Sequence, residues 1–142
     1  MEREIGFYLK KIFQTMEKNL NKDLEDIDLT GMQAHVLLYL YKNRKNIINQ
    51  RDIEREFELT NPTVNGILNR LENKRFIKRV VSLNDARNKE IMITDKSISL
   101  IAEMKKKAKN MENKMTSGIT KEELDTFYQV IKKMFNNVQG GN

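Results

Sequence analysis

The chain has 142 residues, of which 39% are hydrophobic and 32% are charged, and its formal net charge is +6. The absence of cysteine excludes disulfides, thiolate nucleophiles, cysteine metal clusters and oxidation sensing through a thiol. No apolar run approaches the roughly 20 residues that span a bilayer, and the charged N-terminus lacks the apolar stretch of a secretory signal, so we expect a cytoplasmic protein with no membrane partner.

The N-terminal half of the chain predicts three helices. Apolar residues recur every three or four positions over residues 5–20, which indicates a first amphipathic helix. After the acidic segment 23–28, Thr30 and Gln33 form a capping-box pattern that starts a second helix, which ends in the polar run 42–45. Ile47-Ile48 predicts a short strand. Asn49 is then placed to cap a third helix, with Asp52 near its positive end.

The segment from Thr60 onward predicts a fourth helix with two different faces. Thr60 or Asn61 is expected to cap it, and Pro62 fits only the first turn of a helix. Its buried stripe is expected to contain Val64, Ile67, Leu68 and Leu71. The opposite face is uncharged at its centre and rich in hydrogen-bonding groups: Pro62, Thr63, Asn65, Gly66, Asn69, Arg70 and Asn73.

The C-terminal half predicts a hairpin and two more helices. The β-prone runs 77–81 and 91–93 are joined by a polar segment, which indicates a β-hairpin with a long basic tip. Thr94 is placed to cap a fifth helix that runs to Met115, and Gly118 ends it. A second capping box, Thr120 with Glu123, starts a sixth helix that reaches Val138, and we expect residues 139–142 to be disordered.

These elements predict one mainly α-helical domain, residues 1–142, with a small β-hairpin. Residues 30–94 match a winged helix-turn-helix lobe, while residues 1–24 and 95–138 supply helices whose apolar stripes need a partner. Burial of those stripes against a second copy predicts a homodimer. Between Lys42 and Lys89 the chain carries 12 Lys and Arg against 6 Asp and Glu, and the remainder carries 14 of each sign. This local basic excess is typical of a nucleic-acid surface, although a solvated basic face would look the same.

The predicted partner is double-stranded DNA, with the fourth helix in the major groove. Asparagine can pair with the edge of adenine, and arginine suits guanine or a narrow minor groove. We expect base reading by Pro62, Thr63, Asn65, Gly66, Asn69 and Arg70. The cations at the end of this helix and along the hairpin are expected to contact phosphates instead: Lys74, Arg75, Lys78, Arg79 and Lys89.

Gly66 has two interpretations that the sequence leaves open. A glycine inside a helix lowers stability by roughly 0.5–1 kcal/mol relative to alanine, so its presence here needs an explanation. In one interpretation the missing side chain lets the helix backbone approach the bases closely. In the other it is a tolerated substitution on the surface.

The order of elements resembles the MarR family of bacterial transcriptional regulators over nearly the whole chain. The strongest matches are Leu29-Thr30 with Gln33, the run Asn61 to Val64 with Arg70 to Glu72, and Asp85-Ala86-Arg87 in the wing. The resemblance implies that Arg87 enters the minor groove while Asp85 holds the wing loop in shape. It also implies a dimer formed by the terminal helices, and two-fold symmetry then places two recognition helices about 34–36 Å apart on a pseudo-palindromic site.

The chain departs from the family pattern at two positions. Family members commonly have glycine where Arg75 stands, so either the turn into the wing differs or Asn73 adopts the left-handed conformation. Many members carry arginine where Gly66 stands, which puts a DNA contact from that site in doubt.

The function expected from these features is a sequence-specific regulator, a repressor released from its operator by a small, aromatic effector; the effector rests on the resemblance alone. We expect no enzyme, cofactor or metal site, because the chain has one histidine and no glycine-rich phosphate loop. That histidine, His35, is interpreted as a surface or interface residue. The alternative is a winged-helix module for protein contact or assembly, with an incidental basic face.

Overall fold

The computed structural model describes residues 2–81 and 88–140. The chain divides into two compact units, Met1–Met111 and Glu112–Asn142, and each is described by itself. The first unit contains α1 (Ile5–Asp23), the 3-10 turn η1 (Glu25–Ile27), α2 (Gly31–Lys42), α3 (Gln50–Phe57), α4 (Asn61–Asn73), β1 (Ile77–Val81), β2 (Lys89–Ile93), α5 (Asp95–Ile98) and most of α6 (Ile101–Met115). The second unit contains the end of α6 and α7 (Lys121–Gln139).

The predicted starts of α2 and α3 are confirmed at the level of single hydrogen bonds. Gln33 N donates to Thr30 Oγ1 at 3.2 Å, and Thr30 N donates to Gln33 Oε1 at 3.1 Å. The same reciprocal pair joins Asn49 and Asp52. Each box satisfies two backbone donors that a helix N-terminus leaves without partners, so the boundaries of these helices are set locally.

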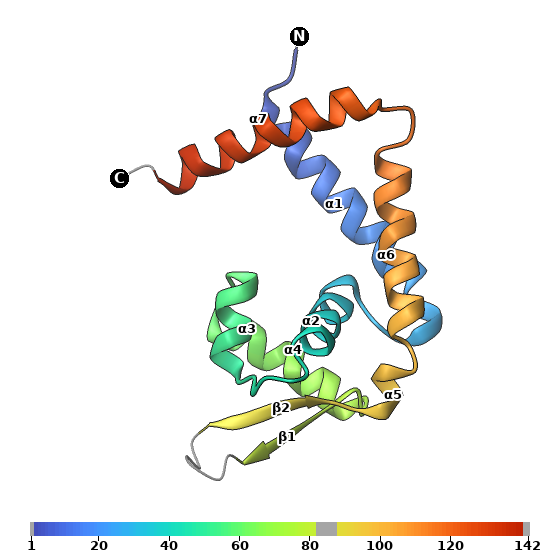
Figure 1. The fold of residues 1–142 in the computed structure, drawn as a ribbon, viewed down its shortest axis with the longest axis vertical. Helices are drawn as coiled ribbons and strands as arrows, with labels where there is room; N and C mark the ends of the chain where they lie inside the picture. The colour runs from blue at the N-terminus through green and yellow to red at the C-terminus, as the bar shows by residue number, and fades with distance from the viewer. Residues whose placement is uncertain (1, 82–87, 141–142) are drawn as a thin grey trace. The chain divides into compact units, whose positions relative to one another are not determined.

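A continuous apolar core joins α2, α3, α4 and the β1–β2 hairpin to the end of α1 and to α6. Figure 1 shows where these elements lie. Leu37, Ile53, Leu68 and Phe76 are fully buried in this core. The apolar stripe predicted for α4 is confirmed, because Val64, Ile67, Leu68 and Leu71 are all buried. Since one face of α4 is held by the core, its opposite face is fixed toward solvent.

The two strands of the hairpin pair antiparallel, from Ile77 opposite Ile93 to Val81 opposite Lys89. The strand predicted at Ile47-Ile48 is wrong, since neither residue belongs to a strand. Ile91 N donates to Ile48 O at 2.8 Å, which attaches this segment to β2. Two residues are too few to build the repeated pairs of a ladder, and the contact is a single backbone hydrogen bond.

The fifth predicted helix is divided into α5 and α6, so its prediction as one continuous helix is wrong. Ser97, which is fully buried, donates from Oγ to Phe76 O at 2.6 Å and so ties α5 to the start of β1. Ser99 Oγ donates to Lys96 O at 2.7 Å. Serine hydroxyls that bond to backbone carbonyls compete with regular helix geometry, and here the helix restarts at Ile101.

The second unit is dominated by α7. Gly118 adopts a left-handed conformation with φ +79°, which confirms it as the residue that ends the preceding helix. Thr120 and Glu123 form the predicted capping box. The helix extends to Gln139, one residue into the segment that we expected to be a tail.

Candidate nucleic-acid interface

The first turn of α4 begins at Thr60, but without the side-chain cap that the sequence predicted. Thr60 Oγ1 lies 2.9 Å from Thr63 Oγ1, and Asn61 Nδ2 donates to Glu54 Oε2 at 3.1 Å, so neither side chain accepts from the helix backbone. Part of the reason is Pro62, which has no N–H to offer at the second position of the helix. The Asn61–Glu54 bond instead fixes the start of α4 against α3.

The structure brings the predicted base-reading residues together on the solvent side of α4. Pro62, Thr63, Asn65, Asn69 and Arg70 are exposed, and Gly66 is half-buried among them. Because the buried stripe fixes the rotation of the helix, these residues are presented outward as one surface. We call residues 62, 63, 65, 66, 69 and 70 the reading face.

Packing within the described protein does not require glycine at position 66. Apart from its chain neighbours and the adjacent backbone of α4, a Cβ atom built on Gly66 would meet only Arg70 Nη1 among the described residues, at 3.5 Å, an ordinary van der Waals contact. Alanine would therefore fit in the free protein, and any requirement for glycine must come from a partner that approaches the helix.

The turn from α4 into β1 uses a left-handed residue that is not glycine. Arg75 has φ 66°, whereas Asn73 remains within α4, so Arg75 and not Asn73 takes the left-handed position in this turn. A side chain in this conformation costs roughly 1–2 kcal/mol relative to the right-handed region. The turn is nevertheless closed by a backbone bond from Phe76 N to Leu71 O at 2.9 Å.

Lys74, expected to contact phosphate, forms hydrogen bonds with other residues of the protein. Its Nζ donates to Asp28 O at 2.8 Å and to Gln33 Oε1 at 3.2 Å, and lies 3.5 Å from Asp28 Oδ1. Its side chain is 27% exposed. Lys74 thus fastens the end of α4 to the capping box of α2, and a phosphate contact would have to break these bonds.

Arg79, also expected to contact phosphate, is folded back onto α4. Its Nε and Nη2 donate to the two carboxylate oxygens of Glu72, at 3.3 and 2.9 Å. The same Nη2 donates to Asn69 Oδ1 at 2.6 Å. The hydrogen bonds and charge of Arg79 hold the pKa of the Glu72 carboxyl below its usual range. Arg79 is therefore part of a three-residue chain that ends on the reading face.

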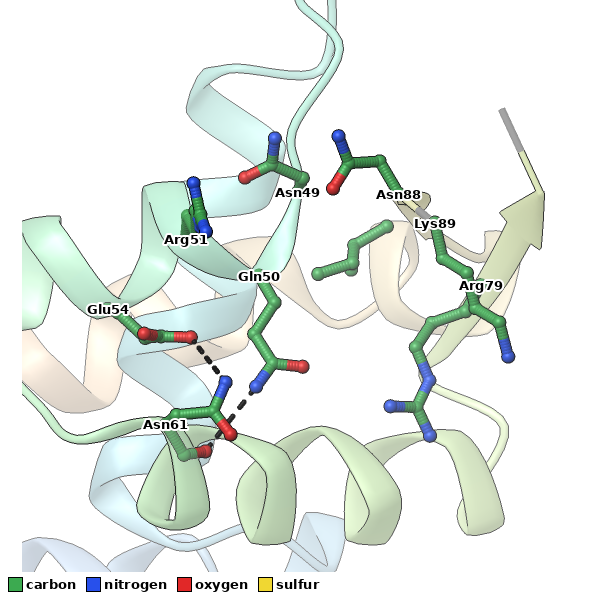
Figure 2. Close-up of a pocket in the computed structure, with 9 residues that line it drawn as sticks. Asn49, Gln50, Arg51, Glu54, Asn61, Arg79, Asn88 and Lys89 are labelled. Atoms are coloured by element: carbon green, nitrogen blue, oxygen red, sulfur yellow. Dashed lines mark hydrogen bonds between the residues drawn. The ribbon is translucent and has the colours of Figure 1, made fainter. Parts of the chain in front are cut away.

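A polar groove of about 530 Å³ lies between α3, the start of α4 and the hairpin (Figure 2). Figure 2 shows Gln50 extending from α3 toward α4, where its Nε2 donates to Asn61 O at 3.4 Å, and Arg79 reaching toward the same helix from β1. Lys89 of β2 and Arg51 of α3 also line it. Sequence reasoning missed Gln50 and Arg51; their place at the start of the helix that precedes α4 was the available signal.

Lys78 is exposed on β1, so its side chain is accessible for phosphate contact. Asp85 and Arg87, the wing residues, lie outside the described residues. His35 is exposed on α2, and within residues 2–81 and 88–140 no three His, Cys, Asp or Glu side chains are grouped so as to hold a metal ion. In the same ranges, no helix combines the length and apolar character needed to cross a membrane.

Comparison with known proteins gives concordant results. Residues 27–88 match the model of the MarR family. The chain is similar to the HTH-type transcriptional regulator BilQ of Clostridioides difficile (strain CD3), with 29% identity over 135 residues, which cover 92% of this chain and 87% of BilQ. The structure of Staphylococcus aureus MepR in complex with DNA aligns with a TM-score of 0.91 and 30% identity, covering 96% of this chain and 99% of MepR. The transcription regulator MarR of Oenococcus oeni PSU-1 aligns with a TM-score of 0.76 and 31% identity, covering 94% and 99%.

Proposed function

Because this chain belongs to the MarR family and is a DNA-binding transcriptional regulator rather than an enzyme, we propose that it represses transcription as a homodimer bound to a pseudo-palindromic operator. The observation that carries this proposal is the reading face of α4: exposed, neutral at its centre, and fixed by a buried apolar stripe on the other side of the helix. A bacterial repressor meets its DNA in the cytoplasm, and we place this protein there.

In this proposal, one group of residues reads the base sequence and a different group of charged residues contacts the phosphates. The reading face supplies hydroxyl and amide groups of the kind that recognise base edges in the major groove. Cations beside it, Arg51 and Lys89 at the groove and Lys78 on β1, are suited to phosphates. We do not include Lys74 among the residues that contact phosphate, because its amine is already bound to Asp28 and Gln33. In this proposal the wing residues Asp85 and Arg87 keep the roles that the family resemblance implies.

The proposed homodimer accounts for two apolar faces, one in each unit. On α1, Ile5 is 63% exposed and Phe13 is 56% exposed. On α7, Phe127 is 51% exposed and Phe135 is 53% exposed. Monomeric soluble proteins rarely leave such stripes in water, and a second copy covering both would remove them from solvent.

We further propose that a small aromatic effector lowers the affinity for DNA. Support comes from the family and from a hollow of about 230 Å³ in the first unit, which has both an apolar lining (Leu40, Ile91, Ile93 and Ile98 among others) and a polar one (Asn43, Arg44, Asn46 and Glu90). The hollow lies where β2 leads through α5 into α6, so a ligand there would contact the connection between the DNA-binding elements and a predicted dimer helix. A ligand that favours one arrangement of this connection over another would shift the population that fits DNA.

The proposal is tested by footprinting on the DNA that flanks the gene of this protein, together with sedimentation of the free protein. We expect a protected, two-fold symmetric site, a dimer in solution, and an affinity that falls steeply as salt rises. A monomer, or an asymmetric footprint, would contradict the dimeric operator complex. Failure to bind any duplex at low salt would favour the alternative, a winged-helix module for protein contact.

A further inference from the structure

Arg79 holds two residues of α4 at once. Its guanidinium is anchored by both oxygens of Glu72, and Nη2 also reaches the side chain of Asn69 at 2.6 Å. Asn69 is exposed on the reading face, whereas the Arg79 side chain is only 16% exposed. A shielded cation from the hairpin therefore sets the position of an exposed amide on the recognition helix.

The chemistry of the guanidinium also decides which way the Asn69 amide points. Arginine has only donors, so the amide atom that faces it is the oxygen, and the NH₂ group of Asn69 is left as the free end. A hydrogen bond with a charged donor is stronger than a neutral one, and this bond is short. Glu72 remains ionised at neutral pH, since Arg79 holds its pKa down, and so the anchor of this chain persists.

We propose that Arg79 is a positioning residue that presents Asn69 to the major groove as a hydrogen-bond donor, and that Asn69 consequently favours guanine. This inference rests on the proposed reading of DNA by α4. Paired recognition of adenine needs both the amide oxygen and the amide nitrogen, because adenine offers one donor and one acceptor. Guanine offers two acceptors, N7 and O6, which suit an amide that presents its NH₂ group while Arg79 takes one of the two lone pairs of its oxygen. The preference for adenine expected from asparagine alone is thereby reversed.

The test is selection of binding sites from a randomised DNA library by the full-length wild-type protein and by variants. Asn69→Ala identifies the base pair that Asn69 reads, as the position where the preference of the wild type is lost. At that position we expect the wild type to favour guanine over adenine on the order of tenfold. Arg79→Lys retains the positive charge but replaces the planar guanidinium, with its several N–H donors, by a single ammonium nitrogen. That nitrogen cannot bind both oxygens of Glu72 and the side chain of Asn69 in this geometry.

We expect Arg79→Lys to lose most of the guanine preference at that one position while keeping its affinity for random DNA. Glu72→Gln, which weakens the anchor and leaves Arg79 in place, should reduce the preference in the same direction. Lys78→Ala is the matched control on the same strand: it should lower the affinity for all sequences and leave the base preference unchanged. Circular dichroism establishes that each variant is folded, and Glu72→Gln provides the test if Arg79→Lys is not.

The possible results separate this inference from the function on which it rests. A wild type that shows no sequence preference overturns the proposed sequence-specific function and the role of Arg79 with it. A wild type that selects a palindrome but prefers adenine at the Asn69 position overturns the inference alone. The inference is also overturned if Asn69→Ala changes no position, or if both anchor variants keep the full guanine preference.

Discussion

Replacing Lys74 with alanine should destabilise the fold and leave electrostatic binding to DNA nearly unchanged. Lys74 Nζ donates to Asp28 O at 2.8 Å and to Gln33 Oε1 at 3.2 Å, which joins the end of α4 to the turn before α2. Hydrogen bonds from charged groups contribute about 1.5–3 kcal/mol when buried. The 27% exposure of this side chain and the 76% exposure of Asp28 reduce the contribution of the ion pair. We expect a loss of about 1–2 kcal/mol.

The assay is urea unfolding at a fixed protomer concentration, since the stability of a dimer depends on concentration. Lys78→Ala is the matched control, because Lys78 is exposed on β1 and its side chain makes no hydrogen bond or ion pair with the residues that the structure describes. It should change the free energy of unfolding by no more than about 0.5 kcal/mol. In a salt titration of DNA binding, Lys78→Ala should lower the slope by about one phosphate contact, while Lys74→Ala should leave the slope at the wild-type value. The opposite pattern, in which Lys74→Ala is as stable as wild type and lowers the salt slope, would refute the reasoning.

Three further substitutions test local features of α4 and its turn. Arg75→Gly should stabilise the protein by about 0.5–1 kcal/mol, because glycine adopts a φ of 66° without strain; thermal unfolding that shows a loss instead would contradict this. Gly66→Ala should also stabilise by about 0.5–1 kcal/mol, and a simultaneous fall in operator affinity would identify Gly66 as a point of close approach, whereas unchanged affinity would identify a tolerated surface residue. Because its folded pKa is lowered, Glu72 contributes stability above its ordinary pKa of about 4.5 that is lost as the pH falls further. Unfolding of wild type and Glu72→Gln should therefore converge in acid, and a constant difference down to pH 3 would exclude this role.

The features predicted correctly from the sequence are those fixed by neighbouring residues. The capping boxes at Thr30 and Thr120 each depend on a partner three positions away, and both form as predicted. The buried stripe of α4 depends only on helical periodicity, so its four apolar residues could be assigned without knowledge of what covers them. These local patterns were enough to place residues 62, 63, 65, 66, 69 and 70 on the solvent side of the helix.

The features that the sequence could not provide are set by contacts between distant segments. The short helix α5, which is separate from α6, is held by the bond of Ser97 to Phe76 O, 21 residues away. Lys74 meets Asp28 across 46 positions, and Arg79 meets Asn69 across 10, so their places at the end of the helix and on the hairpin did not predict these partners. A basic residue near a recognition helix can stabilise the fold through bonds within the protein, or it can contact DNA phosphates. Its hydrogen-bond partners in the structure are needed to distinguish these two roles.

The central claim is that α4 reads sequence while separate cations provide affinity. It is tested most directly by measuring the ratio of operator affinity to random-DNA affinity for wild type, Asn69→Ala and Lys78→Ala over a series of salt concentrations. We predict that Asn69→Ala lowers this ratio on the order of tenfold, and that Lys78→Ala weakens both affinities about equally and leaves the ratio unchanged. If both variants lost only affinity for random DNA, the reading face would be placed on the wrong part of the protein.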